Sequence, residues 1–202
     1  VRQSGILAES AALRALRAPF ESIMSRLLIV VEKLSDWGSY HPSENLVSAT
    51  DYLKGTAAGD TGERVQVINL CRSYKYLGVG YYVSLLAEAR GHRVIPSVRT
   101  INDLRQRSLW GLDVGDLNQR VARVLPGSAD GSSELSMLVY FGQCSHAPLA
   151  DLARQVSEAF PCPILRLDFE HQRSWRIRAI RPAGMHTLND AQEDAFAAAL
   201  DA

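Results

Sequence analysis

The amino-acid sequence predicts an α/β fold: a three-layer-like sandwich with a mixed, largely parallel sheet and a C-terminal antiparallel hairpin. Two observations lead to this prediction. In the first half of the chain, short apolar runs that are typical of buried strands alternate with helical patterns, which indicates parallel strands joined by helices. Near the C-terminus, two segments of alternating apolar and polar residues flank a short polar turn, as in an antiparallel hairpin with one buried face.

The first half is predicted to contain three principal strands, which are Arg26–Glu32, Val65–Leu70 and Val94–Pro96. Between the first two, a short extended piece at Leu46–Val47 precedes a turn of helix capped by Ser48 or Thr50. A longer helix is expected from about Val79 to Arg90, with Gly91 as its C-terminal stop. Its apolar residues at helical spacing are expected to cover the sheet: Val83, Leu85, Leu86 and Ala89.

The second half continues with helices and then changes to antiparallel strands. Thr100–Asp103 is expected to begin a helix, with an N-capping residue and an acidic residue in the first turn. A further helix is predicted over Val114–Val124. Ser128–Ser133 is a turn-rich linker and the clearest internal break in the pattern of helices and strands. It is not taken as a domain boundary, because neither side of it clearly has a complete core. The remaining predicted elements are a strand at Leu135–Phe141, a helix at Leu149–Phe160, hairpin strands at Ile164–Glu170 and Trp175–Ile180, and a final helix from Asn189–Asp190 onward.

The chain is predicted to consist of one compact domain with an extension at each end. Residues 1–23 form an N-terminal extension, helical or disordered, because they have a weak helical pattern but no signal-peptide core. Residues 24–188 form the domain. Residues 189–202 form a helix without a C-terminal cap, which indicates that the chain continues toward a further module.

Composition excludes several classes of protein. The 22 Lys and Arg residues balance the 22 Asp and Glu residues, so bulk charge predicts neither a nucleic-acid nor a membrane partner. No apolar run approaches the roughly 18–20 residues of a membrane span. Three widely spaced cysteines argue against a disulfide framework and for a reducing compartment, here predicted to be the cytoplasm: Cys71, Cys144 and Cys162. Their spacing does not predict a metal site.

The loop Cys71–Tyr82 is the most unusual segment, because cationic and aromatic residues crowd it between an apolar strand and an apolar helix. It would lie at the carboxyl ends of the strands, where open α/β sheets bind ligands. Amide groups at the start of the following helix, and glycines that allow close backbone approach, would favour an anion such as a phosphate or a carboxylate. The predicted substrate- or anion-binding residues are Arg72, Ser73, Tyr74, Lys75, Gly80, Tyr81 and Tyr82.

Simpler interpretations of these residues stay open. Arg72 could pair with a carboxylate such as Glu88, while the tyrosines pack at the domain edge or against a neighbouring domain. Cys71 could be a nucleophile, but a cysteine at the end of a buried strand is usually a small core residue, so no catalytic residue is predicted. Cross-strand ion pairs explain the alternating charges of the hairpin, which are Arg166, Asp168, Glu170, Arg176 and Arg178.

Several segments, taken together and in order, resemble a known family. They include Leu28–Val31, Asp36–Trp37, Asp51–Leu53, Asn69–Tyr76, Gly80–Gly91, Pro96–Ser97, Tyr140–Gly142 and Ile180–Pro182. In this order they are similar to the N-terminal domain of RimK-like ATP-grasp proteins. The resemblance covers roughly Arg26–Asn189.

The resemblance implies an accessory domain that precedes an ATP-grasp module in the same protein. Such proteins resemble glutamate ligases, which use ATP and Mg²⁺ to activate a carboxylate for attack by an amine. Nothing in the sequence looks like that module, so no catalytic residue carries over, and the chain alone is expected to be inactive. The expected partners are the module and a peptide or amino-acid carboxylate substrate. The alternative is a stand-alone small-molecule or peptide binding domain with an anion-binding loop at residues 71–82.

Overall fold

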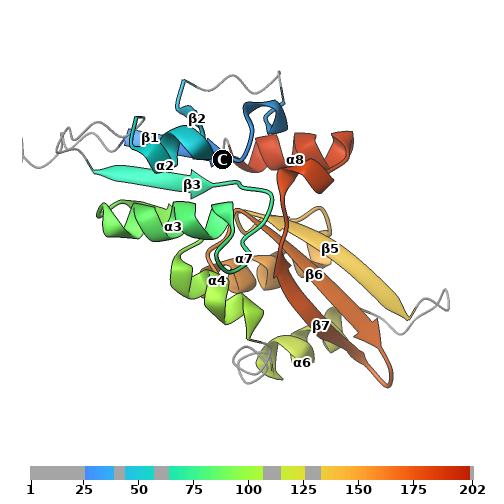
Figure 1. Cartoon of the computed structure of the whole chain (residues 1–202). Helices are drawn as coiled ribbons and strands as arrows, with labels where there is room; N and C mark the ends of the chain where they lie inside the picture. The colour runs from blue at the N-terminus through green and yellow to red at the C-terminus, as the bar shows by residue number, and fades with distance from the viewer. Residues whose placement is uncertain (1–25, 39–43, 57–63, 107–114, 126–132, 201–202) are drawn as a thin grey trace, which may run out of the picture.

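The computed structural model describes residues 26–38, 44–56, 64–106, 115–125 and 133–200 (Figure 1). The strands are β1 (Arg26–Val31), β2 (Leu46–Ser48), β3 (Val65–Asn69), β4 (Arg93–Ile95), β5 (Glu134–Tyr140), β6 (Ile164–His171) and β7 (Trp175–Pro182). The helices are α2 (Ala49–Lys54), α3 (Val79–Ala89), α4 (Val98–Arg105), α6 (Gly115–Val124), α7 (Ala150–Ala159) and α8 (Asp190–Leu200), with 3₁₀ turns η1 (Leu34–Asp36), η2 (Ala147–Leu149) and η3 (Met185–Thr187). The predicted extension at residues 1–23 and most of the predicted break at 128–133 lie outside the described residues.

The α/β class is confirmed, and the parallel and antiparallel strands form two separate sheets. The first sheet has the order β2-β1-β3-β4, and its pairs are parallel. One row of its register joins Leu28 of β1, Val67 of β3 and Val94 of β4. The continuous apolar run of β1 follows from burial on both faces, because side chains of Leu28 and Ile29 point to opposite sides and both are buried.

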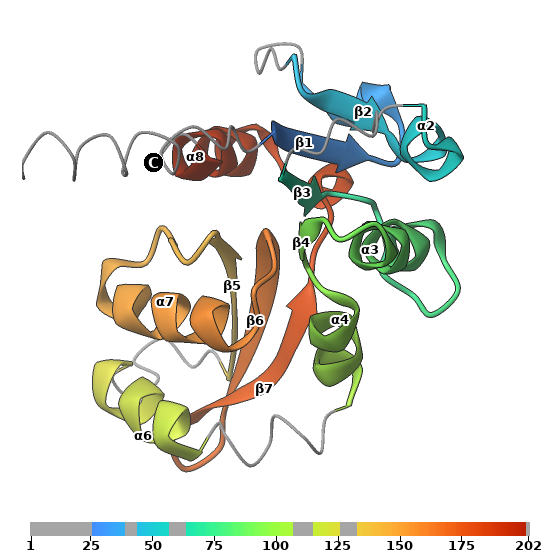
Figure 2. The ribbon, with the colours of Figure 1, turned by 90° about the vertical axis from the view of Figure 1, so that its left-hand side faces the viewer.

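Helices α2 and α3 cover one face of the parallel sheet (Figure 2). Ser48 caps α2, since its hydroxyl accepts a hydrogen bond from the Asp51 amide at 3.1 Å. The predicted sheet-facing positions of α3 are partly wrong: Leu85 and Ala89 are exposed. Val83 is buried as predicted, and Ala87, one turn later on the same face, is buried with it.

The opposite face of the parallel sheet packs against α8 and the adjoining ends of β5 and β6 (Figure 2). Phe196 of α8 is fully buried there, with its ring centroid 6.1 Å from that of Tyr140 and 5.7 Å from that of Phe141. The molecule therefore has three layers. Helices α2 and α3 form the first, the parallel sheet forms the second, and α8 with the antiparallel sheet forms the third. The helix expected near the C-terminus is therefore part of the hydrophobic core. Its extension toward a further module stays a prediction.

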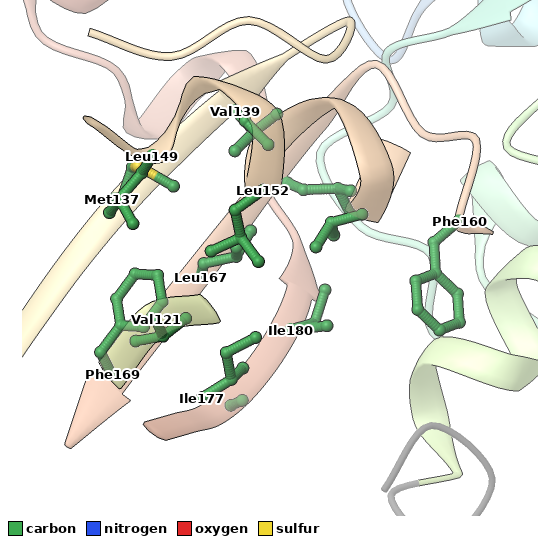
Figure 3. Packing of buried hydrophobic residues seen from close by; sticks show 14 of the residues in the cluster. Val121, Met137, Val139, Leu149, Leu152, Phe160, Leu167, Phe169, Ile177 and Ile180 are labelled. Carbon is green, nitrogen blue, oxygen red and sulfur yellow. The ribbon is translucent and has the colours of Figure 1, made fainter. Parts of the chain in front are cut away.

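The second sheet has the order β5-β6-β7, is antiparallel, and contains the predicted hairpin. Helices α6 and α7 cover its apolar face, where Leu167 and Phe169 pack with Val121 and Leu152 (Figure 3). Of the predicted cross-strand ion pairs of the hairpin, Arg176–Glu170 is present. Arg166 instead pairs with Asp168 on its own strand, β6, and Arg178 reaches Glu134 on β5. Alternation thus buries one face and leaves the other to charged side chains.

Helix α4 connects the two halves, and its N-capping residue differs from the predicted one. Ser97, and not Thr100, is the N-capping residue: its hydroxyl accepts a hydrogen bond from the Thr100 amide at 3.0 Å. Thr100 lies inside the first turn and is buried. Because β4 ends at Ile95, the chain enters the helix as soon as a capping side chain is available. Among the described residues, no helix is long and apolar enough to cross a membrane.

Candidate functional site

The candidate site lies at the carboxyl ends of β1 and β3. Strand β1 lies between β2 and β3. After β1 the chain first adds β2 on one side and then crosses over to add β3 on the other, so the order of the strands reverses between β1 and β3. In open parallel sheets, this switch point leaves a crevice where ligands bind. The loop of residues 71–82 leaves β3 at this point, and η1 leaves β1 beside it (Figure 1).

Asn69, the last residue of β3, joins the strand to the loop and to α3. Its side-chain amide donates to the Gly80 carbonyl at 2.7 Å and to the Ser84 hydroxyl at 2.9 Å, and its oxygen accepts from the Cys71 amide at 3.1 Å. The side chain is fully buried, so each of these bonds replaces one to water. Asn69 therefore sets how closely the start of α3 approaches β3.

Gly80 is required by this close approach. A Cβ atom at this position would lie 2.5 Å from the Ser73 carbonyl oxygen and 2.9 Å from the Cys71 Cβ. The glycine was expected to allow close approach of the backbone to a ligand, but here it allows close approach to its own loop. The space next to the first turn of α3 is thus filled by residues 71–74.

Arg72 is held by a carboxylate of the neighbouring strand end. Its Nε donates to Asp36 Oδ2 at 2.9 Å, and its Nη2 bonds Asp36 Oδ1, a bidentate contact. The guanidinium holds the Asp36 pKa below the usual value of 3.8, against the opposing effect of burial. The suggested pairing with Glu88 is wrong, because Glu88 accepts a hydrogen bond from the Val98 amide instead.

Two of the predicted tyrosines belong to the interior. Tyr74 is buried, and its hydroxyl donates to the Asn69 carbonyl at 2.6 Å. Burial raises the Tyr74 pKa well above its usual value. Tyr81 is also buried, and both pack with Ile101 of α4. Neither ring offers a face on which a planar ligand could stack.

The outer part of the loop is apolar and exposed. Of the seven large hydrophobic side chains that are exposed among the described residues, five lie within residues 76–85. We name these five side chains the aromatic loop surface: Tyr76, Leu77, Val79, Tyr82 and Leu85. The Tyr76 and Tyr82 rings flank that of Tyr81, with centroids 5.2 Å and 6.1 Å from it. Leu77 has φ of +62°, a conformation that leucine rarely adopts, so the turn is held by its surroundings.

The cationic side chains beside this surface differ in their accessibility. Lys75 is exposed, whereas the Arg72 side chain is 36% exposed and occupied by Asp36. The Arg105 guanidinium lies over the Tyr76 ring at 5.6 Å. The assignment of Arg72, Ser73, Tyr74, Lys75, Gly80, Tyr81 and Tyr82 as an anion site stays a prediction.

The chemistry of Cys71 follows from its position in the core. The residue is fully buried, and burial raises its thiol pKa to about 12, so the nucleophilic thiolate is disfavoured. Among the described residues, no three His, Cys, Asp or Glu side chains gather as a metal site requires. The loop does not have the G-x-x-x-x-G-K-[ST] spacing of a Walker phosphate cradle.

Sequence patterns missed the partners that shape this site. Asp36 lies 36 positions before Arg72, and its role was detectable only as an acid that follows a buried strand. Asn69 gave a weaker signal, as a polar residue that ends an apolar run. Arg105 and Leu77 carried no signal at all, because their places depend on how α4 packs against the loop.

A scan of protein-family models matched residues 49–199 to the RimK-like ATPgrasp N-terminal domain. The match spans about three quarters of the 202 residues, from the start of α2 into the last turn of α8. It includes the loop of residues 71–82 and the whole antiparallel sheet. No curated protein matched the chain.

Proposed function

The chain belongs to the RimK-like ATP-grasp N-terminal domain family, and from this premise we propose that it is the accessory domain of an ATP-dependent carboxylate–amine ligase of the glutamate-ligase type. In this role it packs on an ATP-grasp module of the same protein and helps to position a peptide or amino-acid carboxylate. It does not catalyse the reaction alone. The proposed compartment is the cytoplasm, in keeping with three free cysteines.

The observation that carries this proposal is the aromatic loop surface. Exposed apolar side chains are normally scattered, and their concentration in one segment marks an interaction site. Here Tyr76 and Leu77 are each more than half exposed, and they stand at the edge of the sheet where ligands bind in this class of fold. A module seated on this surface would lie directly beside the switch point.

The rim of the surface suggests the charge of its partner. Lys75 and Arg105 are both exposed and flank Tyr76. Interfaces commonly combine aromatic residues and arginine at their centre with a polar rim. We therefore expect the facing surface of the module to carry apolar side chains bordered by carboxylates.

ATP and Mg²⁺ are proposed to bind to the module, where they would activate a carboxylate toward attack by an amine. In this proposal the loop of residues 71–82 does not hold the nucleotide, in keeping with a buried Cys71 and with an Arg72 that is bound to Asp36. The contribution of this chain is positional: it would place the module and bring its substrate to the edge of the parallel sheet.

The test measures binding between this chain and the ATP-grasp module encoded with it, by calorimetry. We expect saturable binding, weakened roughly tenfold or more by Leu77→Ser or Tyr82→Ser, because removing a central apolar contact costs at least about 1.4 kcal/mol. Leu34→Ser is the matched control, since Leu34 is 55% exposed but lies outside this surface.

Equal loss of affinity with Leu34→Ser would contradict the proposed surface. Absence of binding would contradict the accessory role as a whole. The same would follow if the isolated chain hydrolysed ATP in the presence of amino acids without any module.

A stand-alone binding domain is the second candidate. Helix α3 supports it, because Gly78 at its N-cap provides no side-chain hydrogen bond, and the exposed Lys75 lies nearby. This candidate expects the isolated chain to bind inorganic phosphate or an acidic peptide, with affinity lost in Lys75→Ala. Binding that is unaffected by Lys75→Ala would count against the loop as the anion site.

A further inference from the structure

A hollow of about 560 Å³ lies between the C-terminal end of α4 and strand β7. It lies outside the aromatic loop surface, and Arg105 is the one residue of its lining that also belongs to the cationic rim of the proposed function. We propose that this hollow binds a small polyanion that carries two or more carboxylate or phosphate groups. Its lining includes Leu104, Arg105, Arg178, Ala179, Ile180 and Arg181.

Strand β7 contains a bulge beside the hollow. Asp168 on β6 pairs with Ala179, whereas Phe169 pairs with Ile177, so Arg178 is an extra residue in β7. A bulge redirects the side chains around it, and here four consecutive residues, 178–181, line one space. The small side chain of Ala179 leaves that space open between two arginines.

Positive charge exceeds negative charge around the hollow. Three guanidinium groups, of Arg105, Arg178 and Arg181, face one carboxylate, that of Glu170. Glu170 is already paired, since it accepts a hydrogen bond from Arg176 Nε at 2.7 Å. The carboxylate therefore adds little negative charge to oppose an anion.

Two of the three arginines have unused hydrogen-bonding capacity. The carboxylate nearest to Arg181 is that of Asp168, at 3.6 Å, and Asp168 already accepts from Ser136 and Arg166. The Arg181 side chain is 64% exposed. Within the described part of the chain, Arg105 makes a contact with the Tyr76 ring but no ion pair.

The arrangement suits an anion with more than one charged group. A guanidinium binds a carboxylate or phosphate through two parallel hydrogen bonds, and it remains charged at all physiological pH values. Arg105 belongs to α4 and Arg181 to β7, so one ligand could bridge the two elements. The apolar lining of Leu104 and Ile180 excludes water from one side, which strengthens such contacts.

The test is calorimetric titration of the full 202-residue chain at about 0.15 M salt with tripolyphosphate and with tricarballylate. We expect one saturable site whose affinity falls as salt is added. The tighter of the two probes identifies the anionic group that the site prefers. Arg181→Ala and Arg105→Ala should each weaken binding roughly tenfold, which corresponds to loss of a charge-assisted contact.

Arg99→Ala is the matched control, because Arg99 lies on the same helix, is 90% exposed and does not line the hollow. A second variant, Ala179→Leu, fills the hollow and should abolish binding while every arginine remains. If neither probe binds saturably, or if Arg99→Ala weakens binding as much as Arg181→Ala, the proposal is wrong. If Ala179→Leu does not fold, the arginine variants decide the outcome.

The result is separable from the proposed function. Arg181 contacts no residue of the aromatic loop surface among the interactions of the described chain, so Arg181→Ala should leave binding of the ATP-grasp module unchanged. Failure of the polyanion site would leave module binding intact, and failure of module binding would leave the polyanion site intact.

Discussion

At the end of β3 in the parallel half of the molecule, polar side chains are buried and bonded to the backbone. In the antiparallel half, most charged side chains of the hairpin pair with one another on an exposed face, although Asp168 is buried. Asn69 and Tyr74 belong to the first kind, and both are buried with backbone partners. The pair Arg176–Glu170 belongs to the second kind, with the arginine side chain 48% exposed. Buried polar contacts fix the shape of the loop, while exposed pairs are replaceable and leave arginines free to bind other anions.

The largest difference between the halves is expected at two asparagines. Asn69→Leu leaves the Cys71 amide without its partner inside the core and removes the bonds to Gly80 and Ser84, and it should lower the free energy of unfolding by about 3 kcal/mol. Asn118→Leu removes one bond, from the Ile177 amide, at a partly exposed site and should cost only about 1 kcal/mol. Urea unfolding measures both. Equal losses would show that the two halves do not differ in this way.

A smaller difference between the halves is expected in how much stability each one loses at low pH. The Arg72 hydrogen bond lowers the Asp36 pKa below 3.8; for Asp168, burial raises the pKa, but bonds from Ser136 and Arg166 outweigh it. Because the pKa of each carboxylate is lower in the folded state, each one stabilises the fold at pH values above its unfolded pKa near 3.8. That stabilisation is lost as the pH falls through the lower pKa of the folded state. Both halves should therefore lose stability below about pH 4.

Urea unfolding at a series of pH values between about 6 and 2 would assign this loss. Asp36→Asn should flatten the acid limb more than Asp168→Asn, because burial is the largest influence on Asp168 and it works in the opposite direction. A larger flattening in Asp168→Asn would place the main acid-sensitive contact in the antiparallel half.

The smallest difference is expected at two arginines. Arg90 in the parallel half donates to the Tyr52 carbonyl at 2.7 Å and lies over the Tyr52 ring at 5.0 Å, so Arg90→Ala should cost about 1 kcal/mol. Arg154 on α7 pairs with Glu158 while 60% exposed, so Arg154→Ala should cost less than about 0.5 kcal/mol. Thermal unfolding resolves such shifts. A larger loss for Arg154→Ala would contradict the distinction.

Much of the secondary structure could be predicted, because local patterns determine it. Strand β1 follows from an unbroken apolar run, the β6–β7 hairpin follows from alternating apolar and polar residues, and Ser48 caps α2 as expected. The errors arose where the packing of a neighbouring element decides which side chains are buried or which residue caps a helix. Leu85 and Ala89 are apolar but exposed, since the angle at which α3 meets the sheet selects Val83 and Ala87 for burial. Thr100 lies inside the first turn of α4, because Ser97 already supplies the capping hydroxyl two residues after β4 ends.

By itself, the sequence determined the class of fold, the family and the location of the unusual loop. Its composition set residues 71–82 apart from the rest of the chain, and short-range periodicity identified the strand and the helix on either side. These are properties of neighbouring residues along the chain, so a single sequence records them.

The tertiary structure alone decided which loop residues face solvent and which partners they have. Arg72 is bound by Asp36 from β1, Tyr74 turns into the core, and Tyr76 and Leu77 are left exposed. The hollow beside Ala179 likewise lies between a bulged strand and the end of α4. Each contact joins residues far apart in the sequence, and burial, charge pairing and exposure depend on that packing rather than on local composition.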